Sequence, residues 1–96
     1  MVRPLKFRKK DYFWIKEKFP DFYSLLKNTA HPVGAEFYIE LADQDAYGVI
    51  FDGTADVLMN EVTDEGELSK DGLRFEKAWD YADREEKTSG DTQKLL

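Results

Sequence analysis

Few side chains in this 96-residue chain have the types and spacing that catalysis needs. The chain has no cysteine and a single histidine, His31. Thiolate catalysis, disulfides, cysteine zinc sites and a histidine pair for a metal are therefore excluded within this sequence. His31 precedes Pro32 in a segment expected to be a loop, with no obvious nucleophile near it. We therefore expect a solvated side chain rather than a general base.

Two short sequence segments partly match functional motifs, but each lacks an essential residue. Residues 50–54 match the phosphatase pattern Asp-x-Asp-Gly-Thr except that Ile50 holds the position of the nucleophile. An aliphatic side chain cannot form the acyl phosphate of that reaction. Residues 43–48 begin like a calcium loop, but Thr54 holds the position of the bidentate glutamate. The six glycines are dispersed, so we expect no phosphate-binding loop. Because none of these motifs is complete, we also expect no enzymatic activity, no metal site and no cofactor.

The strongest chemical signal is the uneven distribution of charge. The formal net charge is −6, from 20 acidic and 14 basic residues. Residues 1–20 hold seven basic and two acidic residues, whereas residues 21–96 hold seven basic and 18 acidic ones. A basic segment can bind a polyanion, although nucleic-acid-binding domains are usually basic as a whole. An acidic body can instead imitate the phosphate backbone of DNA.

Cations and aromatic residues interleave over residues 6–14, which is the combination that holds single-stranded nucleic acids. The alternative is that the cations lie near the protein's own acidic surface and the aromatic residues are buried. Four large residues at positions 12–15 cover all sides of a helix, so at least one should be exposed or covered by a partner. The candidate contacts to a polyanion or a partner are Arg3, Lys6, Arg8, Lys9, Lys10 and Trp14.

The elements that must position these residues begin with an arm and a broken helix. We expect an arm over residues 1–7 and a helix over residues 12–18 with Asp11 as its N-cap. Pro20 ends that helix and suits the first turn of a second helix over residues 20–27; a single kinked helix is the alternative. The expected buried stripe recurs at helical spacing: Tyr12, Ile15, Phe19, Phe22, Tyr23 and Leu26.

The middle of the chain predicts an antiparallel β-hairpin. Residues 28–33 are expected to form a loop. Apolar residues then alternate with polar ones over residues 36–41, and a second strand is expected over residues 46–51 after a turn at residues 43–45. Residues 55–62 fit a helix capped by Thr54 or a third strand; we prefer the helix and leave the strand open.

A C-terminal helix is the clearest element. Ser69 is its expected N-cap, and Leu68 and Leu73 occupy the positions of a hydrophobic staple. The expected buried stripe is Phe75, Ala78, Trp79 and Ala82. Residues 88–96 are rich in small and polar types and are expected to form a disordered tail.

Together these patterns predict an α+β fold in one domain over residues 1–87. It comprises a basic N-terminal arm, a broken helix, an antiparallel hairpin with or without a third strand, and a C-terminal helix packed on the sheet. Apolar runs are short and no apolar segment follows the basic N-terminus, so we expect an acidic cytoplasmic protein without membrane contact. We expect a non-catalytic interaction or regulatory protein with a protein partner or a homodimer. The alternatives are a nucleic-acid-associated accessory protein that uses the basic arm, and an acidic inhibitor that blocks a DNA-binding site.

Overall fold

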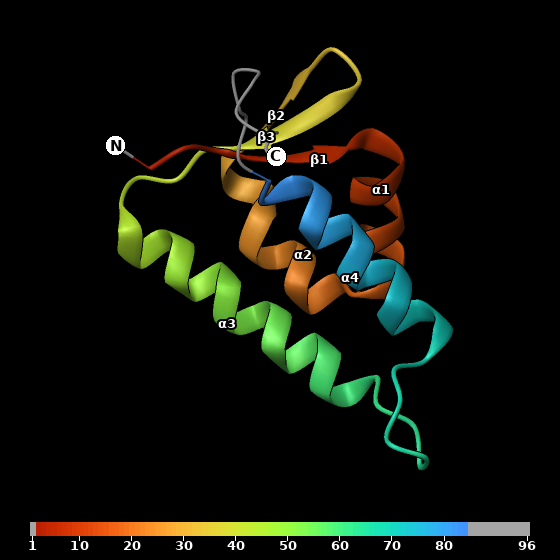
Figure 1. Ribbon diagram of the computed structural model, residues 1–96. Helices are drawn as coiled ribbons and strands as arrows, with labels where there is room; N and C mark the ends of the chain where they lie inside the picture. The colour runs from red at the N-terminus through yellow and green to blue at the C-terminus, as the bar shows by residue number, and fades with distance from the viewer. Residues whose placement is uncertain (1, 85–96) are drawn as a thin grey trace, which may run out of the picture.

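The structure is a computed structural model that describes residues 2–84 (Figure 1). It is an α+β fold, as predicted, with a three-stranded antiparallel sheet at one end of a group of helices. The tail expected at residues 88–96 lies outside the described residues. The elements in chain order are β1 (Leu5–Arg8), α1 (Lys9–Lys18), α2 (Pro20–Leu26), the 3-10 helix η1 (Lys27–Thr29), β2 (Ala30–Val33), β3 (Glu36–Ile39), α3 (Gln44–Asn60) and α4 (Lys70–Ala82).

The sheet has the strand order β1-β3-β2, so β3 pairs with both neighbours. A tight turn joins β2 to β3, and Gly34 has a φ of 59°, which glycine adopts without strain. Leu5 pairs with Ile39 on the sheet face that enters the core, and Lys6 pairs with Tyr38 on the other face. Helix α4 packs against β1, so the prediction of a C-terminal helix on the sheet is confirmed.

The predicted break between α1 and α2 is confirmed, but the predicted start of α1 is wrong. Strand β1 runs directly into the helix, which begins at Lys9 and has no side-chain cap. The amide of Lys9 instead donates to the carbonyl of Ala35 (3.0 Å), so the sheet takes up one of the free donors of the first turn. Asp11 is a buried residue of that turn, and Arg8 Nε donates to its Oδ2 (3.1 Å).

The predicted partner of β3 is also wrong. Residues 46–51, expected as a strand, lie in helix α3, and the strand that pairs with β3 in the hairpin is β2, from the segment expected as a loop. Asp43 caps α3 by accepting a hydrogen bond from the amide of Ala46 (2.9 Å) rather than forming a turn. The helical alternative for residues 55–62 is confirmed as far as Asn60, but Thr54 is a buried residue in the middle of α3 and not its cap.

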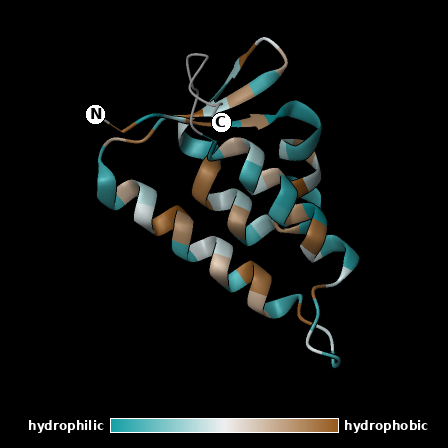
Figure 2. Cartoon of the chain, viewed as in Figure 1, coloured by the Kyte–Doolittle hydropathy of each residue, from teal (hydrophilic) through white to brown (hydrophobic). Residues whose placement is uncertain are grey.

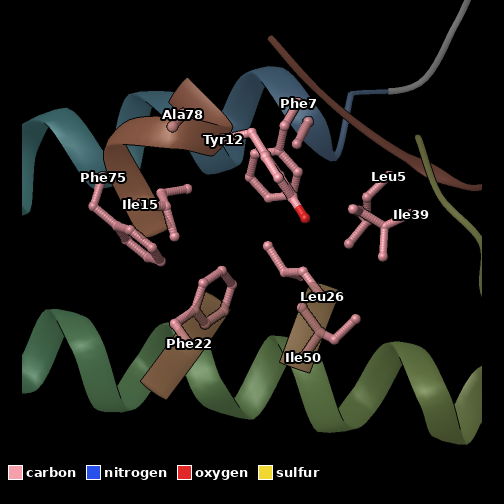
Figure 3. Close-up of a cluster of buried hydrophobic side chains, with 11 residues drawn as sticks. Leu5, Phe7, Tyr12, Ile15, Phe22, Leu26, Ile39, Ile50, Phe75 and Ala78 are labelled. Atoms are coloured by element: carbon pink, nitrogen blue, oxygen red, sulfur yellow. The ribbon is translucent and has the colours of Figure 1, made fainter. Parts of the chain in front are cut away.

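The core lies where all the layers meet, and its side chains come from the sheet and all four α-helices (Figure 3). The ring of Phe75 packs edge-on against Phe19 (5.3 Å) and Phe22 (5.0 Å), which joins α4 to α2. The predicted cap of α4 is confirmed, since the amide of Gly72 donates to Ser69 Oγ (3.0 Å). In the predicted stripe of α4, Trp79 is only partly buried, and the other three residues are buried.

Candidate functional site

Helix α3 is the element whose apolar side chains the chain leaves most exposed. Only Ile50 and Thr54 are buried among its 17 residues. Val49, Phe51 and Met59 are 57%, 49% and 74% exposed. Figure 2 shows hydrophobic residues recurring along this helix, which lies at the edge of the molecule farthest from the sheet. The chain therefore leaves an apolar helix surface that its own core does not use.

Three of the four exposed apolar residues of α3 share one side of the helix, and the fourth, Val49, lies about a third of a turn away from them. Gly48, Phe51, Ala55 and Met59 follow one another at spacings of three or four residues, and we call this surface the α3 face. The ring of Phe51 stacks on Tyr47 (5.9 Å) from the same helix. It also lies 6.4 Å from the ring of Trp79 on α4. These contacts hold one side of Phe51 in place and leave the other side open.

The charged residues of helix α3, and of the segment around it in the sequence, are all acidic. Helix α3 contains Asp45, Asp52 and Asp56, each exposed, and no basic residue. Residues 42–69 as a whole hold eight acidic residues and no Lys, Arg or His. Lys18 from α1 lines a groove beside α3, but the carboxylates of α3 itself attract cationic groups toward the apolar surface.

A groove of about 610 Å³ runs between α2 and the second half of α3. Leu25 and Phe22 form part of its α2 wall, and Gly53 lies opposite them. A Cβ atom at Gly53 would be 3.2 Å from Phe22 Cδ1, so glycine permits the close approach of the two helices. Met59 and Asp56 also line the groove, which is therefore continuous with the α3 face.

Of the cations predicted as site residues, Lys6 and Arg8 lie in β1, Lys9 and Lys10 lie in α1, and Arg3 precedes the sheet. Arg3 Nη2 donates to the backbone carbonyl of Asp83 (2.9 Å). Arg8 pairs with Asp11. These two arginines therefore lie near the protein's own carboxylates, as the structural alternative had predicted.

The lysines of the same segment lie near aromatic rings or solvent. The ammonium of Lys6 is 5.2 Å from the ring of Tyr38, and that of Lys9 is 5.9 Å from the ring of Phe37. Such contacts are weak when the cation is exposed. Lys10 is exposed in the first turn of α1. The segment thus presents charge from the end of β1 and the start of α1.

Trp14, the aromatic member of the predicted set, is half-buried. The guanidinium of Arg74 lies over its ring (4.4 Å), and Phe19 packs against it edge-on. Phe13 is instead the exposed member of residues 12–15, at 53%. The prediction that one of these four is exposed is therefore confirmed. Phe13 was not among the predicted site residues, although its position among Lys9, Lys10 and Lys16 could have indicated it.

Three polar pairs lie among the described residues, two of them away from α3 and one between Tyr47 of α3 and Asp83. His31 Nε2 is 2.7 Å from Glu40 Oε2 at the exposed end of the β2–β3 pair. The hydroxyl of Tyr81 donates to Glu36, and that hydrogen bond, followed by burial, raises the pKa of Tyr81. Burial and then a hydrogen bond to Asp83 (2.8 Å) raise the pKa of Tyr47. Within residues 2–84, no group of three or more acidic or histidine side chains is arranged to hold a metal ion.

Comparisons with protein families, with curated proteins and with solved structures find no match for this chain. Among the described helices, none combines the length and the apolar character that crossing a bilayer requires. Function must therefore be inferred from the surface of the chain itself.

Proposed function

We propose that this chain is a non-catalytic interaction protein that binds another protein molecule through the α3 face. The observation that carries the proposal is the exposure of Phe51 and Met59 along one side of a helix next to the α2–α3 groove. Single exposed apolar side chains are ordinary, but a row of them beside a groove is typical of an interaction site.

The chemistry of the α3 face favours a particular kind of partner surface. An apolar side chain can lie against Phe51, Ala55 and Met59, and basic groups beside it can pair with Asp52 and Asp56. Complementary charges of this kind increase the rate and the specificity of association more than its final affinity. The same carboxylates repel phosphate groups, so the α3 face favours a basic protein surface over a nucleic acid.

The nucleic-acid alternative from the sequence would use the other end of the molecule. Its contacts would come from the predicted cations of β1, α1 and the preceding segment, of which Arg3 and Arg8 interact with Asp83 and Asp11. A phosphate backbone would have to compete with those two carboxylates. This alternative stays a separate prediction, and salt-dependent binding of single-stranded DNA or RNA would test it.

The experiment is a comparison of two exposed apolar positions on different helices. Met59→Lys changes the α3 face, and Leu73→Lys changes an exposed leucine of α4 (48% exposed) as the matched control. The wild-type chain and the Leu73→Lys variant should recover the same protein from the native cell. The amount of that protein recovered by Met59→Lys should be at least tenfold lower. Direct binding of the purified partner should show the same order. Equal recovery by both variants would contradict the proposal.

A further inference from the structure

We propose that the occupant of the α3 face is a second copy of this chain, which docks through the exposed side of α1. This inference rests on the proposed function, because it names the protein that α3 binds. It follows from the presence, in one molecule, of two helix surfaces that each expose an aromatic ring and that carry opposite charges.

The first surface centres on Phe13. Its ring is 53% exposed and is held edge-on by Tyr12 (5.8 Å) and Phe37 (5.5 Å). The helix places cations one turn before and one turn after this ring, at spacings of three and four residues. We call this surface the α1 patch: Lys9, Lys10, Phe13 and Lys16.

The second surface is the α3 face, and its charges are the reverse of those on the α1 patch. Phe51 and Met59 offer apolar area to Phe13, and Asp52 and Asp56 offer carboxylates to the lysines around it. A fixed aromatic ring bordered by three lysines has the composition of an interface hot spot, and the exposed Glu17, four residues after Phe13, borders the α1 patch with the opposite charge. No other described helix presents an exposed aromatic ring with three lysines within one turn of it.

The two surfaces cannot meet within one molecule. Helix α2 packs against both α1 and α3, and Figure 1 shows it between them. We infer one such contact between neighbouring copies, from α1 of one to α3 of the next, which leaves an unused α1 patch at one end and an unused α3 face at the other. The wild-type chain should then grow beyond the dimer as its concentration rises. A reciprocal two-fold dimer, which would form the contact twice, would instead stop at twice the monomer mass.

The size of the surfaces predicts weak association. Stable protein interfaces bury about 800 Å² on each partner, and two short helix faces offer less than that. Assembly should therefore be reversible and visible only at high protein concentration. Sedimentation equilibrium and light scattering measure such an equilibrium without immobilising the chain.

The test uses one charge-neutralising and one charge-reversing variant, which block opposite ends of the contact without giving the two altered surfaces opposite charges. Lys9→Gln with Lys10→Gln removes two of the three cations of the α1 patch, and glutamine is a good helix former, so the fold should be kept. Asp52→Lys with Asp56→Lys removes the α3 face, and lysine is a good helix former at these exposed positions. Lys77→Glu, on the exposed side of α4, is the matched control. Circular dichroism melts verify that each variant folds.

Each double variant alone should have the monomer mass of 11.2 kDa at concentrations where the wild type and Lys77→Glu are larger. An equal mixture of the two double variants should form a species of twice that mass and nothing larger, because one intact contact joins them. A wild type that is monomeric at millimolar concentration would overturn the inference. So would association that survives in either double variant, or a mixture that stays monomeric. If the chain is monomeric and Met59→Lys still abolishes binding of a different protein, the proposed function stands and only this inference fails.

Discussion

Gly53 of α3 lies so close to Leu25 of α2 that a Cβ atom at position 53 would be 2.7 Å from Leu25 Cδ1. Gly48, one turn and a half earlier in the same helix, has no atom within 4 Å of the place where its Cβ would lie. The two glycines therefore have different roles, although both interrupt an otherwise apolar helix. Only Gly53 is required for the contact of α3 with α2 and for the wall of the groove.

This difference predicts opposite effects of alanine at the two positions. Alanine is favoured over glycine in a helix interior by about 1 kcal/mol, so Gly48→Ala should raise the free energy of unfolding by about 0.5–1 kcal/mol. Gly53→Ala should instead lower it by about 1 kcal/mol, because Phe22 and Leu25 must move. Urea denaturation measures both. Equal stabilisation by the two substitutions would show that α2 and α3 do not approach as described.

The buried carboxylate of Asp11 should contribute to stability through the arginines beside it. Arg8 Nε is 3.1 Å from Asp11 Oδ2, and Arg74 Nη2 is 4.0 Å from Oδ1. Because both guanidiniums are partly exposed, we expect Asp11→Ala to cost only about 1–2 kcal/mol. Glu17→Ala, at an exposed position of the same helix, should change stability by less than about 0.5 kcal/mol. Equal changes in the free energy of unfolding for the two substitutions would show that Asp11 does not stabilise the fold through these arginines.

Two apolar residues of α4 test which side of this helix faces the core. Phe75 is fully buried between α2 and α4, whereas Leu73 is exposed. Phe75→Ala should lower the free energy of unfolding by about 3–5 kcal/mol, which is a large share of the stability of a small domain. Leu73→Ala should have little effect in the same thermal melts. A large loss with Leu73→Ala would indicate a rotation of α4 about its axis.

The tyrosines predict a loss of stability at alkaline pH. Burial, followed by a hydrogen bond to Tyr23, raises the pKa of Tyr12 above the ordinary value of about 10. The unfolded chain therefore releases the Tyr12 proton at lower pH than the folded chain does. The stabilisation is fully present below pH ~10 and is lost as the pH rises above it. Tyr12→Phe should reduce the fall in the free energy of unfolding above pH ~10; an unchanged slope would contradict the assignment.

The sequence predicted those elements whose signals are local. Pro20 occupies the first turn of α2, where its missing amide is not needed, and the chain bends at Phe19 as expected. Ser69 caps α4 for a similarly local reason. The fold class and the contact of α4 with the sheet followed from these elements and from the alternating residues of β3.

Long-range contacts decided the elements that the sequence predicted wrongly. Tyr47, Val49 and Phe51 occupy alternate positions, as on one face of a strand, yet Tyr47, Ile50 and Thr54 also follow helical spacing. Packing of α3 against α2 through Gly53 selects the helix, and no nearby residue reveals it. Strand β2 was expected as a loop because it contains Pro32, but an edge strand tolerates a residue without an amide.

The candidate site was predicted only in part for the same reason. The lysines at positions 9 and 10 belong to the α1 patch, and their clustering was visible in the sequence. The α3 face could not be found while residues 46–51 were assigned to a strand, because that assignment separates Phe51 from Met59. With Asp43 as the helix cap, the spacing of Phe51, Ala55 and Met59 would have indicated one exposed stripe.

Site-specific photo-crosslinking shows whether the α3 face is where this chain binds another protein molecule. A photoreactive phenylalanine analogue replaces Met59 in one variant and Leu73 in another, and both are irradiated in the native cell. We expect a discrete cross-linked product, containing either a partner protein or a second copy of the chain, from position 59 and not from position 73. The absence of a product at position 59, or identical products from both positions, would contradict binding at the α3 face.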